Sequence, residues 1–324
     1  MMKDASFTPF IRLGLTMAAI LLTVGSPLRA EPAKSTTHYG SPASLGNGQI
    51  RTFVTVTTDH VPSSVGVEFD AALLDQLPTE ASDGRWDIVD SAGNVVWHCC
   101  GHEVELSFAP AVAGLIPFRH FVMNWNPAGH FPPDIYDVPH FDLHFYTIDS
   151  ATRQSILAPT AEMACGDPGF APVTCEDLAL LTQPLPADQQ PPGYLSVDAV
   201  EPGMGNHLLD FSSGEWNGRP FTHTWIFGTM GGNLSFWEPM ITRDYLGWVK
   251  DLSPSLKAVQ DPNGGSIRTT GSGSSVTIPI RIPAAAPVAG YYPTHYQIQY
   301  RKPGRTFRVS LESLILLPAS AGSE

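Results

Sequence analysis

Residues 139–146 read PHFDLHFY and alternate between polar and apolar side chains. In an extended strand, successive side chains point to opposite faces, so His140, Asp142 and His144 share one face. The three apolar residues between and after them share the other face. This stretch therefore predicts a β-strand with one apolar face and one face that carries two imidazoles and a carboxylate.

Similar short stretches recur along the chain, separated by Gly, Pro, Asn and Ser. Only residues 70–77 and 150–156 have the pattern of short helices. The expected fold class is mainly β: a β-sandwich or barrel-like single domain with few short helices. The other expected strands are 51–57, 64–69, 86–89, 94–98, 103–108, 118–125, 221–227, 233–237, 276–281, 296–300 and 306–311.

Composition excludes several classes of protein. Of 324 residues, 18 are Lys or Arg and 31 are Asp or Glu, which gives a net charge of −13. Charged residues make up 15 %, and 29 Gly and 30 Pro are spread without a collagen period. This excludes a coiled coil, a helical bundle and a chain disordered by its charge. Phosphate binding needs basic side chains, so the balance also argues against nucleic acid and anionic membranes as partners.

The first thirty residues have the pattern of a signal peptide. Lys3 and Arg12 stand in a polar start, and residues 13–24 form an apolar run. The run is shorter than the about 20 residues that cross a bilayer. A Gly-Ser-Pro break and a cleavage site after Ala30 follow it. We therefore expect residues 1–30 to be removed on export; an uncleaved N-terminal anchor is the alternative.

Export sets the expected domain organisation and location. Residues 31–48 are polar and rich in Gly, Ser and Pro, which predicts a flexible lead-in. Residues 49–318 are then a single β-rich domain. The expected location is periplasmic or secreted, with no membrane span after signal cleavage.

The four cysteines indicate disulfides, because an exported chain meets an oxidising compartment. Cys165 and Cys175 flank a Gly- and Pro-rich loop and are expected to pair. The adjacent cysteines in WHCCGH leave three alternatives open: a vicinal disulfide, a bridge from each to a distant cysteine, or a soft-metal site. The soft-metal alternative would use His98, Cys99, Cys100 and His102.

The strand at 139–146 has the reach to hold a metal ion. At about 3.3 Å per residue, the Cα atoms of His140 and His144 lie roughly 13 Å apart. With metal–nitrogen bonds of about 2.1 Å, a cation above Asp142 can touch both rings. Asp142 is then the candidate catalytic residue, as a base or as the group that orients a ligand. The alternatives are a polar strand face in water and a hydrogen-bonded His/Asp network.

Three later segments add candidate ligands: His207 in PGMGNH, His223 in FTHTW and Glu238 in FWEPM. Each also has a plainer interpretation, as a surface-loop residue, a satisfied core histidine and an ion-pair partner of Arg243, respectively. Histidines with one carboxylate are ligands of zinc, iron, copper or manganese, so a divalent transition metal is the expected cofactor. The metal candidates are His140, His144, His207, His223 and Glu238, whereas His120, His130 and His295 are interpreted as structural.

The motifs VPHFDLHFYTI, PGMGNH, FTHTWIFG and FWEPMIT, in this order, resemble the signature of a family of exported bacterial β-rich proteins of unknown function. The family is typified by a Thermus protein under sigma-E/anti-sigma-E control. The resemblance covers about residues 50–315. It implies one domain and an envelope location, but no reaction. Carried over position by position, it singles out His140, Asp142, His144, His207, His223 and Glu238.

Two function classes follow, since the sequence has no G-x-S-x-G, H-E-x-x-H, P-loop or G-x-G-x-x-G motif. The first is a metal-dependent envelope enzyme of unknown reaction. An open coordination position on its metal would activate water or dioxygen. A cleft lined by Tyr146, Trp225 and Trp237 around that position would favour this class. The second is a non-catalytic envelope or stress-related binding or structural protein whose metal, if any, is structural. The expected partner is a small molecule or an envelope component, and the sequence leaves room for a homo-oligomer.

Overall fold

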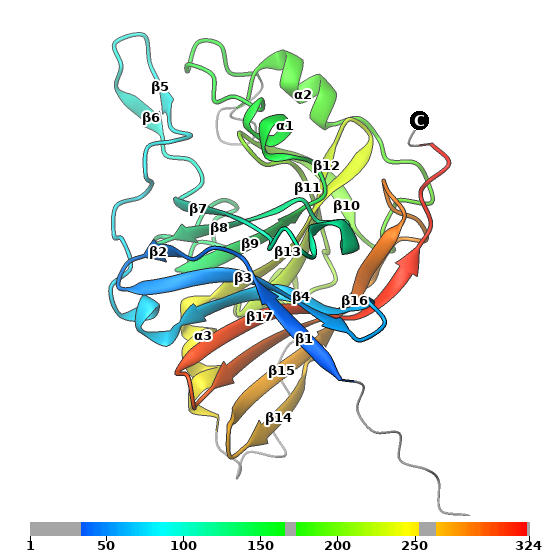
Figure 1. Ribbon diagram of the computed structural model, residues 1–324. Coiled ribbons are helices and arrows are strands. Elements are labelled where there is room, and N and C mark those ends of the chain that lie inside the picture. Colours follow the sequence, from blue (N-terminus) through cyan, green and yellow to red (C-terminus); the bar gives the residue numbers. More distant parts are fainter. Residues whose placement is uncertain (1–33, 166–172, 253–263, 323–324) are drawn as a thin grey trace, which may run out of the picture. The chain divides into compact units, whose positions relative to one another are not determined.

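The computed structural model describes residues 34–165, 173–252 and 264–322 (Figure 1). The expected signal peptide lies outside these described residues and stays a prediction. Among the described residues, no helix is both long enough and apolar enough to cross a membrane.

Two large antiparallel sheets make up most of the fold. The first has the strand order β1-β3-β4-β17-β16-β15-β14, with β2 also paired to β3, and the second has the order β10-β11-β12-β13-β9-β8-β7. Strands β5 and β6 form a separate hairpin. The strands are β1 Ser35–Tyr39, β2 Ala43–Leu45, β3 Gly48–Thr57, β4 Pro62–Asp70, β5 Ile88–Val89, β6 Val95–Trp97, β7 His102–Ser107, β8 His120–Asn126, β9 His140–Tyr146, β10 Leu195–Glu201, β11 Gly205–Leu209, β12 His223–Met230, β13 Asn233–Thr242, β14 Ser266–Thr270, β15 Gly273–Pro279, β16 Gly290–Arg301 and β17 Thr306–Leu317.

The two sheets share one apolar core. Phe141 and the alternate residues that follow it on β9 point into this core, as the sequence pattern predicts. The ring of Phe141 lies 6.4 Å from that of Phe69 on β4, and the ring of Trp237 on β13 lies 4.8 Å from that of Tyr292 on β16 (centroid distances). The prediction of a mainly β fold is confirmed in its sandwich form, because the described strands of both sheets end in edge strands and close no barrel.

Two strands lie in the segment 31–48 that the sequence predicts to be a flexible lead-in. Strand β1 pairs with β3 from Ser35, opposite Thr57, to Tyr39, opposite Phe53. Strand β2 pairs with the other end of β3. The prediction is wrong for these residues, because edge strands gain backbone hydrogen bonds from a neighbour that polar composition does not reveal.

The helices are few and short, as expected, but their positions are only partly predicted. The first expected helix is a 3-10 turn at Ala71–Asp75, and the second is α1, Ser150–Gln154. Two others, α2 (Cys175–Leu181) and α3 (Arg243–Asp251), were not expected. The start of α3 has an ordinary sequence signal: the Thr242 hydroxyl accepts a hydrogen bond from the Tyr245 backbone N–H.

The outer face of the second sheet is buried as well as its inner face. Every residue of β9 is buried, although β9 carries its polar side chains on this outer face. A second apolar cluster covers the face, with Val122, Tyr136, Met204 and Phe236 among its members. The segment after β6, the loop between β8 and β9, and the turn between β10 and β11 supply the cover. This excludes the interpretation of His140, Asp142 and His144 as a strand face in water.

Candidate metal centre

Three strands of the second sheet bring two histidines and a glutamate together. Because Phe145 of β9 pairs with Trp237 of β13, the residue after Trp237, Glu238, falls beside His144. His207 reaches the same place from β11, on the far side of β12. We call His144, His207 and Glu238 the glutamate triad.

The donor atoms of the glutamate triad lie within 4.8 Å of one another. Nε2 of His144 is 3.5 Å from Oε1 of Glu238, and the side chains of these two residues are only 0 % and 2 % exposed. His207 donates its Nδ1–H to the carbonyl of Ala199 at 2.8 Å. A carbonyl can only accept, so Nε2 of the neutral ring keeps its lone pair. Backbone acceptors fix the tautomer of metal-binding histidines in the same way.

Burial keeps both histidines of this triad in the ligand form. It lowers the pKa of His144 to about 3 and that of His207 to about 4. Burial, reinforced by the nearby charge of Asp142, raises the pKa of Glu238 well above its ordinary value. Near neutral pH, a cation at the triad therefore competes with a proton only at Glu238.

The triad also contains polar atoms that the protein does not satisfy. Within the described residues, neither ring nitrogen of His144 has a hydrogen-bond partner, and Oε2 of Glu238 has none. Buried polar groups are almost always paired, because leaving one unpaired costs about 1–3 kcal/mol. A cation bound to the lone pair of His144 and to Oε2 of Glu238 would pair two of these three atoms and reduce that cost.

A second group lies beside the first and is centred on Asp142. Oδ1 of Asp142 is 3.1 Å from Nε2 of His140, and Oδ2 is 3.4 Å from Nε2 of His130. Asn126 donates its side-chain N–H to Oδ2 at 2.6 Å. We call His130, His140 and Asp142 the aspartate triad. Its donor atoms also lie within 4.8 Å of one another.

Charge dominates the aspartate triad. Burial opposes ionisation of Asp142, but His140 and His130 outweigh it and hold the pKa of the carboxyl well below its ordinary value. Asp142 in turn raises the pKa of His130, although burial opposes a charge on that ring. Asp142 is therefore an ionised carboxylate that positions two imidazoles, and it is a weak base.

The structure divides the metal candidates between these groups. His140 belongs to the aspartate triad, and the glutamate triad contains His144, His207 and Glu238. His223 joins neither, because it points into the core between the sheets, where its Nδ1 is 2.6 Å from the Tyr296 hydroxyl. By contrast His130, which the sequence suggests to be structural, lies in the aspartate triad.

Both triads border one cavity of about 590 Å³. Asp142, His130, His207 and Glu238 are in its wall, and most of the remaining lining is apolar. The apolar and aromatic lining includes Val96, Trp97, Phe131, Tyr136, Val197, Met204, Leu209, Phe211, Trp216, Ile226 and Met240.

The cysteines pair locally. Cys165 and Cys175 form the expected disulfide, and Cys99 and Cys100 form the vicinal one. The soft-metal alternative for WHCCGH is not seen, because His98 contacts Asp87 at 2.9 Å and His102 contacts the carbonyl of Glu80 at 2.8 Å.

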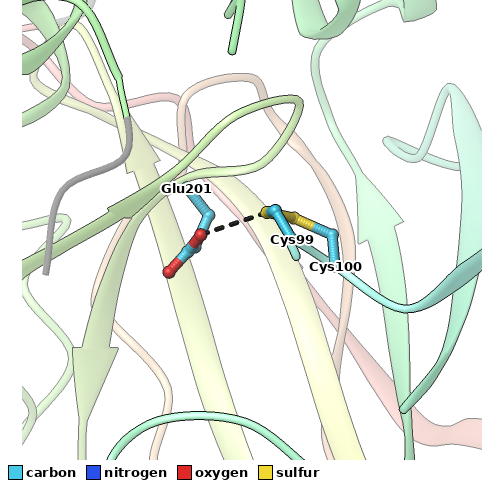
Figure 2. A group of neighbouring side chains, drawn as sticks. All are labelled: Cys99, Cys100 and Glu201. Atoms are coloured by element: carbon cyan, nitrogen blue, oxygen red, sulfur yellow. Dashed lines mark hydrogen bonds between the residues drawn. A yellow bond between two sulfur atoms is a disulfide. The ribbon is translucent and has the colours of Figure 1, made fainter. Parts of the chain in front are cut away.

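Glu201, which the sequence analysis did not single out, lies against the vicinal disulfide in the cavity wall (Figure 2). Its carboxyl oxygen is 3.2 Å from the Cys99 sulfur. A disulfide sulfur has no proton, so the Glu201 carboxyl is the donor when it is protonated. Burial raises the pKa of Glu201 to about 7, which maintains a large protonated fraction near neutral pH.

Gly228 gives the site a packing requirement that a mutation can test. A Cβ at this position on β12 would overlap the ring of Phe236. That ring packs against His144 and His207, with centroid distances of 4.9 Å and 5.3 Å. We expect Gly228→Ala to lower the free energy of unfolding by about 1–3 kcal/mol and to shift the imidazole NMR signals of both histidines.

Urea unfolding of Gly228→Ala is best compared with Gly114→Ala. The added methyl of the second variant meets no atom within 4 Å. It should stay within about 0.5 kcal/mol of the wild type. Equal stability of the two variants would show that Phe236 does not rest on Gly228.

No family model, curated protein or solved structure matches this chain.

Proposed function

We propose that this is an exported metal-dependent enzyme that acts on a small molecule, with a divalent transition metal held by His144, His207 and Glu238. One observation carries the proposal: the half-buried His207 converges beside a cavity with the buried His144 and Glu238, whose side chains keep polar atoms without a hydrogen-bond partner among the described residues. The expected leader at 1–30, the two disulfides and the resemblance to exported bacterial proteins support export.

The spacing of the donors fits a transition metal. Bonds of about 2.1 Å arranged tetrahedrally place neighbouring ligand atoms about 3.4 Å apart. The contact between His144 and Glu238 is 3.5 Å. Two histidines with a glutamate are the ligands of catalytic zinc sites and of non-haem iron(II) sites. Zinc and iron are therefore favoured over copper and manganese.

Three protein ligands leave a coordination position for water or substrate. His207 and Glu238 both border the cavity, so that position has access to a bound molecule. A metal with an open position supplies Lewis acidity, which polarises a substrate oxygen or activates water. The side chains of the aspartate triad then orient a substrate molecule that binds beside the metal.

The cavity wall indicates the class of substrate. Its size is in the range of drug-sized ligand sites. Among the described residues, no Arg or Lys lines the cavity, whereas the acidic residues Asp142, Glu201 and Glu238 all line it. Phosphate esters and other anions would find no arginine or lysine among the described residues there. We infer that the substrate is an uncharged, largely apolar molecule with an oxygen atom that can reach the metal.

Elemental analysis and Zn²⁺ titration of protein purified without a His-tag test this proposal. We expect His207→Ala to weaken Zn²⁺ binding at the glutamate triad by more than about 100-fold, since losing even a partner of a ligand costs about 10–100-fold. Glu238→Gln should have the same effect. His295→Ala, on β16 of the other sheet, is the matched control and should bind as the wild type does.

The outcomes separate the two function classes. Wild-type affinity in both triad variants would exclude the proposed site. A metal whose removal by a chelator unfolds the protein would favour the non-catalytic class with a structural metal. A metal that can be removed and restored without unfolding would favour the enzyme.

A further inference from the structure

The aspartate triad contains a contact that needs a proton or a metal ion between its two atoms. His140 directs Nδ1 at the carbonyl of Val138 at 2.6 Å, and His130 directs Nδ1 at the carbonyl of Phe131 at 2.7 Å. Both acceptors are carbonyl oxygens, so both Nδ1 atoms carry the hydrogen. The remaining nitrogen of each ring then turns a lone pair toward the carboxylate of Asp142.

Lone pairs that face one another require a cation between them. Nε2 of His140 and Oδ1 of Asp142 are 3.1 Å apart, and the two side chains are 0 % and 5 % exposed. Neither atom makes a hydrogen bond within the described residues. The cation is therefore either a proton, which makes the group an imidazolium–carboxylate network, or a metal ion.

The arrangement suits a metal ion in three respects. The 3.1 Å contact between Nε2 of His140 and Oδ1 of Asp142 lies within the about 3.0–3.4 Å between neighbouring ligands at bonds of about 2.1 Å, octahedral or tetrahedral. The backbone carbonyls and the Asn126 amide hold the outer atoms of the ligands, as partners do in established metal sites. His130 is 38 % exposed and borders the cavity, so an ion has a route in.

We propose that His130, His140 and Asp142 bind a second divalent transition metal beside the glutamate triad. The two sites have no ligand in common. Asp142 and His144 are alternate residues on one face of β9, roughly 6.7 Å apart along the strand. A molecule in the cavity can therefore meet two cations, one at each triad.

Zn²⁺ titration of the full-length protein at pH 7.5, by calorimetry and by equilibrium dialysis, tests this second site. We expect two equivalents for the wild type. His130→Ala should bind one, with the affinity of the lost site reduced by more than about 100-fold, and should keep the site that His207→Ala removes. The double variant should bind none. His98→Ala, which changes an exposed histidine outside both triads, should bind two.

The single variants keep the two proposals distinguishable. One equivalent in the wild type that survives His130→Ala and disappears in His207→Ala would overturn the second site and leave the proposed function intact. The converse pattern would support the second site and remove the basis of the proposed function. His130 is partly exposed, so its variant should fold, and circular dichroism would verify this.

Discussion

Replacing Arg153 with methionine is expected to lower the free energy of unfolding by about 3 kcal/mol or more. The guanidinium of Arg153 is fully buried and pairs with Glu103 at 2.6 Å, whose side chain is 1 % exposed. It also donates to the carbonyl of Gly203 at 2.8 Å, in the turn that precedes β11. Without the arginine, Glu103 keeps a pair with Arg85, but Arg85 is 41 % exposed and compensates only in part.

Denaturant unfolding of two further variants would show where the loss arises. Arg119→Met replaces an exposed arginine and should change stability by less than about 0.5 kcal/mol. Adding Glu103→Met to Arg153→Met should restore part of the loss, because apolar pairs often replace buried ion pairs without cost. If the double variant is less stable than Arg153→Met, the unpaired carboxylate is not the cause.

Replacing Trp237 with alanine is expected to lower the free energy of unfolding by about 3–5 kcal/mol. The side chain is fully buried and lies between the sheets, with its ring 5.8 Å from that of Phe118 and 4.8 Å from that of Tyr292. Its neighbour on β13, Glu238, points to the opposite face of the sheet. Trp237→Ala should therefore lose stability while it remains able to bind metal at low temperature.

The matched variant on the other face should behave in the opposite way. Glu238→Gln should lose metal affinity while keeping the stability of the metal-free wild type within about 1 kcal/mol. Trp248 on α3 is only partly buried, so Trp248→Ala should lower the free energy of unfolding by less than Trp237→Ala does. Comparable losses in the two tryptophan variants, measured by thermal and urea unfolding, would argue against Trp237 as a central contact of the sandwich.

Much of the fold could be predicted because a strand displays its two faces in sequence. The alternation at 140–146 correctly assigns Phe141 to the core and His144 to the other side. Strand order leaves no such local trace, so the sequence could not distinguish a sandwich from a barrel. The edge strands in 31–48 were missed for a related reason, because their hydrogen-bond partners lie elsewhere in the chain.

The candidate site was predictable where parity on a strand was the deciding factor. His223 has the same parity as Trp225 and Phe227 in FTHTWIF, and it indeed shares the core face with them. His130 could not be found this way, since it lies in a Pro- and Gly-rich loop with no periodicity. Only the folded chain brings it to Asp142, twelve positions later.

Both faces of β9 are buried, so the strand can pair with its neighbours in only one register without burying polar side chains in the apolar core. A slip by one residue would move two imidazoles and a carboxylate into the apolar core and would turn Phe141 toward the cavity. The misaligned chain would bury unpaired polar groups and lose both triads at once. If the proposed sites bind metal, metal occupancy should therefore report that β9 is in its correct register.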